Sequence, residues 1–203
     1  MSSNPGKLYV ISGPSGTGKG TICAELLKDY NNEFSVSMTT RAARPGEEDG
    51  KHYFFVTKEV FQENIDKGNF LEHAVVFDNM YGTPKDAVMK KLERGRNVIL
   101  DIDVQGGLQV KSAMPEAVMI FILPPDMDTL KARLIGRNTE SADVIEKRLS
   151  KAVNEIKLIG EYDYYVVNDD LDTAFAEVKS IITAESRRIP ERVKPIISKY
   201  EKQ

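Results

Sequence analysis

The sequence contains little cysteine and little histidine. Its 203 residues include one cysteine, Cys23, and two histidines. A single cysteine excludes a disulfide bond within the chain, and so few cysteines and histidines do not make a metal-binding cluster. Cys23 falls in a stretch whose apolar residues have helical spacing, so we expect a small, buried side chain there.

A long apolar run and a strong excess of one charge are also missing. No stretch is long enough to span a bilayer, and the first residues, "MSSNPGK", lack the apolar core of a signal peptide. A net charge of −3 argues against a general nucleic-acid-binding surface. We therefore expect no membrane partner, no nucleic-acid partner and, by default, a cytoplasmic location.

The features that are present leave room for an enzyme. A hydrophobic content of 41% and a charged content of 29% are ordinary for a globular protein, and 203 residues fit one large domain. Apolar strand-like stretches alternate with stretches of helical spacing, which predicts an α/β fold with helices flanking a parallel sheet. The expected strands are residues 7–12, 97–103, 116–123 and 162–168, and the expected helices are 19–30, 128–136 and 171–188.

Two segments interrupt this alternation. The first, about residues 34–83, holds the short strand candidates "HYFFV" and "FLEHAVVF" and the polar loop "TTRAARPGEEDGK". The second, residues 136–148, is polar and follows an expected helix end at Gly136. No internal repeat or interdomain linker is evident. The prediction is one core, made of residues 1–33, 84–135 and 149–203, with two insertions.

The segment "GPSGTGKGT" directly follows the apolar run "LYVIS". It nearly fits the phosphate-binding pattern G-x-x-x-x-G-K-[ST], with a glycine in place of the usual hydroxyl residue. In such a loop, backbone N–H groups and the positive end of the next helix surround phosphate oxygens, and the lysine reaches the β- and γ-phosphates. A structural turn is the alternative, but a strand before and a helix after favour phosphate binding. The residues so assigned are Gly13, Pro14, Ser15, Gly16, Thr17, Gly18, Lys19, Gly20 and Thr21.

The missing hydroxyl at Gly20 bears on the magnesium ion of a bound nucleotide. Thr21 supplies a hydroxyl one position later, and we expect it to contact a phosphate. Magnesium readily keeps much of its hydration shell, so it is expected to be held largely through waters and the phosphates themselves. No direct protein ligand for the metal is assigned.

Several polar residues of the first insertion suit a second phosphate. Arg41 and Arg44 lie in a loop too polar to be buried, and guanidinium groups bind phosphate oxygens in a bidentate way. The alternative is an exposed loop in which these arginines only balance Glu47, Glu48 and Asp49.

Other candidates are equally ambiguous when each is taken alone. Tyr53 and Tyr81 offer phenolic donors, although a half-buried core tyrosine is the commoner case. Glu72 lies in an alternating strand pattern, where a solvent-facing position is the default. Asp101 and Asp103 end an expected strand and share one face, or they cap the helix that follows.

Taken together, these segments resemble the guanylate kinases. The motifs "GPSGTGKGT", "FSVSMTTRAARPGEEDGKHYFFV", "FLEHAVVFDNMYGT", "ILDIDVQG", "FILPP" and "VVNDD" occur in the family's order and approximate spacing, over nearly the whole chain. The resemblance implies a P-loop kinase core, a β-rich GMP-binding subdomain at 34–83 and a mobile lid at 136–148. It also implies transfer of a phosphoryl group from ATP, with Mg²⁺, to GMP and also dGMP. Met80 departs from the family, where an aromatic is common.

The resemblance implies roles for individual residues as well. Carboxylates opposite the N1–H and 2-amino donors of guanine, and hydroxyls opposite O6, explain a preference for guanine over adenine. Guanine contacts are implied for Ser37, Glu72, Thr83 and Asp103, and GMP phosphate contacts for Arg41, Arg44, Tyr53 and Tyr81. The catalytic residues implied are Lys19, Arg44 and the lid arginines Arg137 and Arg148. Arg133 lies beside these, and Asn168 and Asp169 are implied near the adenine of ATP.

Two other functions stay open at this point. A guanylate-kinase-like binding module keeps the fold but binds protein partners, and such modules typically lack an intact phosphate loop, unlike this chain with Lys19. The other is a different nucleotide kinase or a P-loop hydrolase. Consumption of ATP with GMP, AMP, UMP or no acceptor distinguishes all three.

Overall fold

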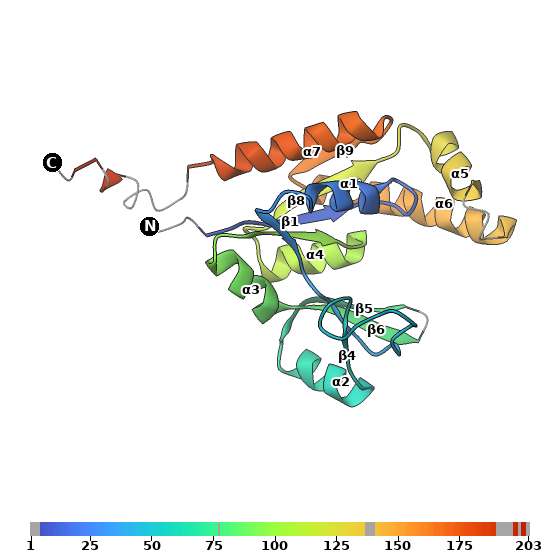
Figure 1. Ribbon diagram of the computed structural model, residues 1–203. Helices are drawn as coiled ribbons and strands as arrows, with labels where there is room; N and C mark the ends of the chain where they lie inside the picture. The colour runs from blue at the N-terminus through green and yellow to red at the C-terminus, as the bar shows by residue number, and fades with distance from the viewer. Residues whose placement is uncertain (1–4, 77, 137–140, 190–196, 199, 202–203) are drawn as a thin grey trace.

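The structure, a computed structural model, describes residues 5–76, 78–136, 141–189, 197–198 and 200–201. A five-stranded parallel sheet with the strand order β2-β7-β1-β8-β9 forms its centre (Figure 1). The strands are β1 (Leu8–Ser12), β2 (Asn32–Phe34), β7 (Asn97–Asp101), β8 (Val118–Leu123) and β9 (Tyr164–Val167). Because β1 and β8 are covered on both faces, they need continuous apolar runs. The predicted α/β fold with a parallel sheet is confirmed.

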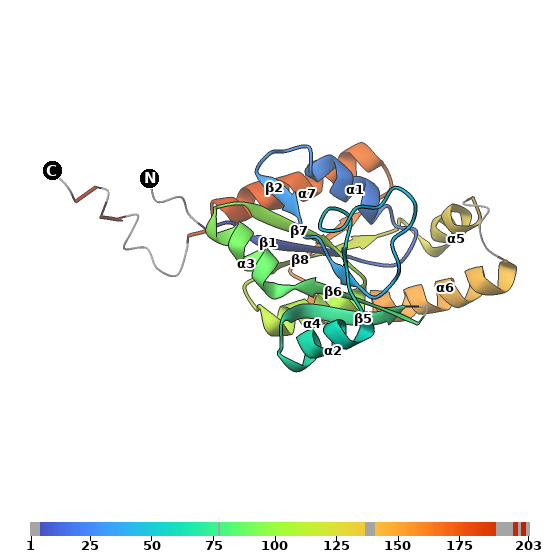
Figure 2. The same cartoon turned by 60° about the horizontal axis from the view of Figure 1, so that its bottom comes forward.

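Helices cover both faces of this sheet (Figures 1 and 2). Tyr9 and Ile11 of β1 pack on one face, whereas Leu8 and Val10 pack on the other. Alternate residues of this strand therefore contribute side chains to two apolar cores. Cys23 is buried in the first core, as expected. The covering helices are α1 (Lys19–Leu26) and α7 (Leu171–Ser186) on the first face, and α3 (Lys85–Glu93) and α4 (Val104–Ala113) on the second.

Two further helices lie beyond the carboxyl ends of the strands, at the right of Figure 1. α5 (Met127–Ile135) and α6 (Ala142–Ile156) pack together through Leu130, Leu134 and Ile145, and the turn η1 (Ile159–Glu161) leads on to β9. In open parallel sheets, ligands bind at this edge. Among the helices that the structure describes, none is long and apolar enough to cross a membrane.

A second sheet with the order β4-β3-β6-β5 lies below the core in Figure 1. Leu71 of this sheet joins the apolar core under α4, and His73 exchanges hydrogen bonds of 3.1 and 3.2 Å with Gln109 of α4. These contacts hold the sheet against the core. Its elements are β3 (Met38–Thr39), β4 (Phe54–Phe55), β5 (Phe70–Val76) and β6 (Asn79–Pro84), with α2 (Lys58–Asp66) beside them.

Some predicted element ends were wrong. The helix expected over 19–30 ends at Leu26, whose carbonyl accepts a 2.9 Å hydrogen bond from the buried side chain of Asn32. The chain must turn there because β2 begins at Asn32. The strand expected over 97–103 ends at Asp101, since Asp103 is the N-cap of α4.

Candidate active site

The loop between β1 and α1 has the backbone of a phosphate cradle. Gly13 and Gly18 adopt φ values of 142° and 87°, which favour glycine. A Cβ added at Gly13 would lie 2.2 Å from the carbonyl oxygen of Ile122, and one at Gly18 would lie 2.3 Å from Nδ2 of Asn168. Both positions favour glycine by conformation, and space is limited by backbone at Gly13 and by the Asn168 side chain at Gly18.

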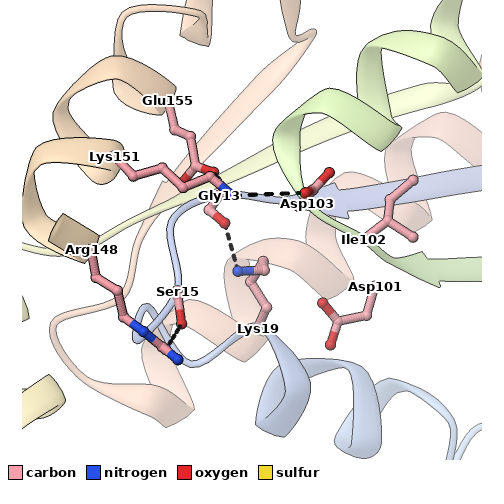
Figure 3. Close-up of a pocket in the computed structure, with 9 residues that line it drawn as sticks. All are labelled: Gly13, Ser15, Lys19, Asp101, Ile102, Asp103, Arg148, Lys151 and Glu155. Atoms are coloured by element: carbon pink, nitrogen blue, oxygen red, sulfur yellow. Dashed lines mark hydrogen bonds and ion pairs between the residues drawn. The ribbon is translucent and has the colours of Figure 1, made fainter. Parts of the chain in front are cut away.

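Lys19, the first residue of α1, folds back over this loop (Figure 3). Its Nζ donates to the carbonyl oxygens of Gly13 at 2.6 Å and Pro14 at 2.9 Å. Burial lowers the pKa of Lys19, while the nearby carboxylate of Asp101 acts in the opposite direction. The ammonium group is thus already held inside the loop, where a phosphate would meet it.

Two cavities adjoin the loop. The larger, of about 350 Å³, lies at the start of α1, and the smaller, of about 250 Å³, lies between the loop and α6 (Figure 3). Ser15, Lys19 and Asp101 line both, so the two spaces meet at the lysine. The larger is also lined by Gly16, Gly18, Gly20 and Thr21, and the smaller by Gly13, Ile102, Asp103, Arg148, Lys151 and Glu155.

A carboxylate faces the position where the usual motif carries a hydroxyl. A Cβ added at Gly20 would lie 3.4 Å from Oδ2 of Asp101. Burial raises the pKa of Asp101, and Lys19 counteracts that shift. Among the described residues, no three His, Cys, Asp or Glu side chains gather to hold a metal ion.

Three residues predicted to bind ATP brace the loop from the β9 side. The buried side chain of Asn168 donates through Nδ2 to the carbonyl oxygen of Thr17 at 2.7 Å. Arg133 of α5 donates to the carbonyl oxygens of Asn168 at 2.8 Å and Asp169 at 3.3 Å. The segment after β9 is thereby fixed against the loop.

The solvent-facing position that strand alternation predicts for Glu72 is wrong. Its exposed fraction is 8%, and its carboxylate lies beside Gly106 of α4, next to a register shift in β5 between Phe70 and Glu72. Burial raises the pKa of Glu72, and the charge of Asp103 adds to the effect. Thr83 of the neighbouring strand donates a 2.6 Å hydrogen bond to its Oε1. Ser37 directly precedes β3, where Met38 pairs with Gly82, and so lies level with Thr83.

Asp103 faces the same point from the core. A Cβ added at Gly106 would meet Oε2 of Glu72 at 3.2 Å and Oδ1 of Asp103 at 3.4 Å, so both carboxylates flank this glycine. The helix-capping alternative is confirmed for Asp103, whose Oδ1 accepts from the Gly106 amide at 2.8 Å. The cap orients the carboxylate through Oδ1, while Oδ2 lies 3.9 Å from Nζ of Lys151 (Figure 3).

Arg41 and Tyr53, in the loop between β3 and β4, lie close to Tyr81 of β6. The Cζ of Arg41 lies 5.5 Å from the centre of the Tyr53 ring, and the rings of Tyr53 and Tyr81 are 6.0 Å apart. Arg44 is exposed, and its backbone amide donates to Glu47 at 2.8 Å. A guanidinium group and two phenols thus lie side by side next to the second sheet.

Arg148 reaches the phosphate loop from α6. Its Nη1 donates to Oγ of Ser15 at 3.0 Å (Figure 3). Arg137, the other predicted lid arginine, lies outside the described residues. Sequence reasoning missed Lys151 and Glu155, which line the smaller cavity with Arg148. The signal was available, because positions 148, 151 and 155 fall on one face of a helix.

The fold and site define an α/β protein that carries a P-loop for nucleotide phosphates, with a second polar site facing it. The family model described as guanylate kinase matches residues 5–185. The guanylate kinase of Clostridioides difficile is 50% identical over 199 residues, covering 98% of this chain and 97% of that protein. That of Lactococcus lactis is 52% identical over 185 residues, covering 91% and 90%. The chain belongs to the guanylate kinase family.

Solved structures agree with this assignment. The crystal structure of guanylate kinase from Anaplasma phagocytophilum has a TM-score of 0.71 and 35% sequence identity, covering 93% of this chain and 90% of that one. The SH3-kinase fragment of tight junction protein 3, in its apo form, has a TM-score of 0.50 and 14% identity, covering 91% and 59%. The second likeness concerns the fold alone.

Proposed function

We propose that this chain transfers the terminal phosphoryl group of ATP to the phosphate of GMP, and also of dGMP, giving GDP or dGDP. The observation that carries the proposal is a pair of carboxylates, Glu72 and Asp103, flanking Gly106, with Asp103 and the P-loop lysine Lys19 lining one cavity. An ionised carboxylate only accepts hydrogen bonds, and guanine offers two donors, N1–H and the 2-amino group. The pair therefore suits guanine.

The remaining guanine contact falls to a hydroxyl. The Thr83 hydroxyl already donates its hydrogen to Glu72 at 2.6 Å, so we assign the donor to guanine O6 to Ser37. Thr83 then orients the carboxylate that reads N1–H. Adenine carries an acceptor at N1. If adenine were bound, its N1 and the Glu72 carboxylate would be two acceptors facing each other with no hydrogen between them.

The phosphate contacts follow from charge and reach. We assign the GMP phosphate to Arg41, Arg44, Tyr53 and Tyr81, and the transferred phosphoryl group to Lys19, the loop amides, Arg148 and Arg137. Phosphoryl transfer mainly requires in-line positioning and neutralisation of negative charge. The phosphate oxygen of GMP is already an anion at neutral pH, so no strong general base is needed.

Magnesium fits this site as a companion of ATP. No described cluster of side chains makes a protein cage for it, whereas Asp101 and Thr21 line the larger cavity with oxygen atoms. These residues would hold the ion together with waters and phosphate oxygens. When bound, it neutralises phosphate charge.

Each part of the chain has its own role in this reaction. Residues 34–83 bind GMP, residues 136–148 act as a lid over the phosphates, and the remaining residues form the core. Closure excludes water, which would otherwise accept the phosphoryl group. We also propose that the enzyme works in the cytoplasm, in purine nucleotide metabolism.

The test is ATP consumption by the purified chain with GMP, AMP, UMP or no acceptor. We expect fast turnover with GMP, with slow consumption in the other three reactions. Equal rates without an acceptor would indicate a hydrolase, and preference for AMP or UMP would indicate another nucleotide kinase. No consumption, together with retained GMP binding, would favour a binding module.

A further inference from the structure

Glu47, in the loop between β3 and β4, joins two of the arginines assigned to the GMP phosphate. Its Oε1 lies 2.8 Å from Nη2 of Arg41, and its Oε2 accepts a 2.8 Å hydrogen bond from the backbone amide of Arg44. One carboxylate therefore fixes the guanidinium group of the first arginine and the main chain at the second. Composition alone predicts only a balancing surface charge.

The surroundings distinguish this pair from an ordinary surface ion pair. The side chains of Arg41 and Glu47 are 14% and 19% exposed, whereas the adjacent pair Lys51–Glu48 is 65% and 66% exposed and 3.3 Å long. Exposed pairs of the second kind contribute little. Hydrogen bonds from Arg41 and from the Arg44 amide lower the pKa of Glu47 to about 2, so it stays ionised at working pH.

Arg41 is restrained on its other sides too. Its Nη1 donates to the carbonyl oxygen of Ala42 at 2.8 Å, and its Cζ lies 5.5 and 5.9 Å from the centres of the Tyr53 and Phe55 rings. A guanidinium group has five N–H donors, and the contacts with Glu47 and Ala42 use two. A side-chain hydrogen bond with Tyr81 engages the guanidinium group as well. The donors left over remain for a phosphate, in an orientation that is already set.

We propose that Glu47 is a positioning residue for the phosphate of the acceptor nucleotide. It acts through Arg41 and the backbone at Arg44, and touches no substrate itself. Holding a long side chain in its bound orientation removes part of the entropy cost of binding. The inference rests on the proposed function, since it presumes that Arg41 and Arg44 bind the GMP phosphate.

The test compares Glu47→Gln with the matched control Glu48→Gln, using KM for GMP, KM for ATP, kcat and inhibition by guanosine. Losing a hydrogen bond to a charged group commonly weakens binding by about tenfold. We expect Glu47→Gln to raise KM for GMP about tenfold and to leave KM for ATP unchanged. Guanosine lacks the phosphate, so its inhibition constant should stay within about twofold of the wild-type value. Glu48→Gln should match the wild type in every measurement.

Three results would overturn the inference. Unchanged or tighter GMP binding in Glu47→Gln would mean that the carboxylate is idle or competes with the phosphate. Equal weakening of GMP and guanosine would mean that Glu47 only supports the fold of the loop. Glu47→Asp serves as a second variant if Glu47→Gln is unstable, because the shorter side chain cannot reach both arginines. A wild-type KM for GMP in Glu47→Asp would also overturn the inference. Wild-type protein that does not phosphorylate GMP would instead refute the proposed function.

Discussion

The hydroxyl of Thr83 donates a 2.6 Å hydrogen bond to Oε1 of Glu72, from β6 to the adjacent strand β5. This bond favours one orientation of an amide that replaced the carboxylate, the one in which the hydroxyl keeps donating. In Glu72→Gln, the amide oxygen would take the hydrogen of Thr83, and the NH₂ group would face the guanine donors. A donor would then oppose a donor in a buried place.

The first prediction is therefore a loss of base selectivity in Glu72→Gln. We expect kcat/KM for GMP to fall about 10²-fold, since a buried unsatisfied polar group costs about 1–3 kcal/mol. The preference for GMP over IMP, which lacks the 2-amino group, and over AMP should shrink. Steady-state kinetics with the three nucleotides measure this, and Glu63→Gln, on exposed α2, is the control. Full retention of both preferences would show that Glu72 does not read guanine.

The second prediction concerns Lys19. Replacing it with methionine removes a cation that already donates to the carbonyl oxygens of Gly13 and Pro14. Turnover should drop by at least about 10²-fold, the scale of losing one electrostatic stabiliser of a transition state. Circular dichroism should show an intact fold. Lys28→Met, at a side chain that is 71% exposed, should behave as wild type. Near-normal GMP phosphorylation by folded Lys19→Met would contradict the assignment.

How far the sequence predicts this molecule depends on how local each feature is. The phosphate loop is predictable because a buried strand, a glycine-rich turn and a helix follow one another between Leu8 and Leu26. The burial of Glu72 is not predictable, because alternation within a strand does not say what covers each face. The end of α1 at Leu26 was missed for another reason, because the side chain that hydrogen-bonds to the Leu26 carbonyl, Asn32, lies outside the helical pattern. Lys151 was within reach of prediction, because it lies one helical turn from Arg148, which the sequence had already assigned to the phosphates.

The third prediction uses pH to test an ion pair that ties the two ends of the core together. Glu185 of α7 accepts 2.7 Å hydrogen bonds from Lys7 and from Tyr164. Burial acts to raise the pKa of Glu185, but these two donors outweigh it, so the pKa lies below its ordinary value. The stabilisation is therefore present above the unfolded-state pKa of about 4.3 and is lost as the pH falls through the lower folded-state pKa.

Glu185→Gln should accordingly lower the free energy of unfolding at pH 7 by about 1–3 kcal/mol. The difference from wild type should shrink below about pH 4. Urea denaturation across this pH range measures it, with Glu177→Gln, exposed on the same helix, as the control. A difference that stays constant down to pH 3 would rule out an ionised Glu185 as the source.

The fourth prediction concerns Arg148 of α6 and distinguishes a role in the transition state from a role in binding the acceptor. Arg148 touches the P-loop through Ser15, at 3.0 Å. If it acts on the transferred group in the transition state, Arg148→Ala should lower kcat by about 10²-fold or more and barely change GMP binding without ATP. Lys147→Ala, one residue earlier and exposed, is the control. Calorimetry that shows GMP binding abolished in Arg148→Ala would place the residue in the acceptor site instead.

The last prediction distinguishes backbone strain from a steric clash at the phosphate loop. Gly18 and Gly68 have φ values of 87° and 66°, so alanine at either position is strained by about 1–2 kcal/mol. Only at Gly18 does the new Cβ meet an atom, Nδ2 of Asn168 at 2.3 Å, whereas at Gly68 nothing lies within 4 Å. Moving Asn168 would break its 2.7 Å hydrogen bond to Thr17 and loosen the loop.

Gly18→Ala should therefore destabilise the protein more than Gly68→Ala in urea denaturation, and only Gly18→Ala should raise KM for ATP. A double-mutant cycle identifies the cause. In an Asn168→Ala background the clash is absent, so adding Gly18→Ala should cost only the strain seen at Gly68. If Gly18→Ala is as mild as Gly68→Ala in the wild-type background, the side chain of Asn168 does not limit the space at the loop. If its extra cost persists without Asn168, the loop backbone itself requires the glycine.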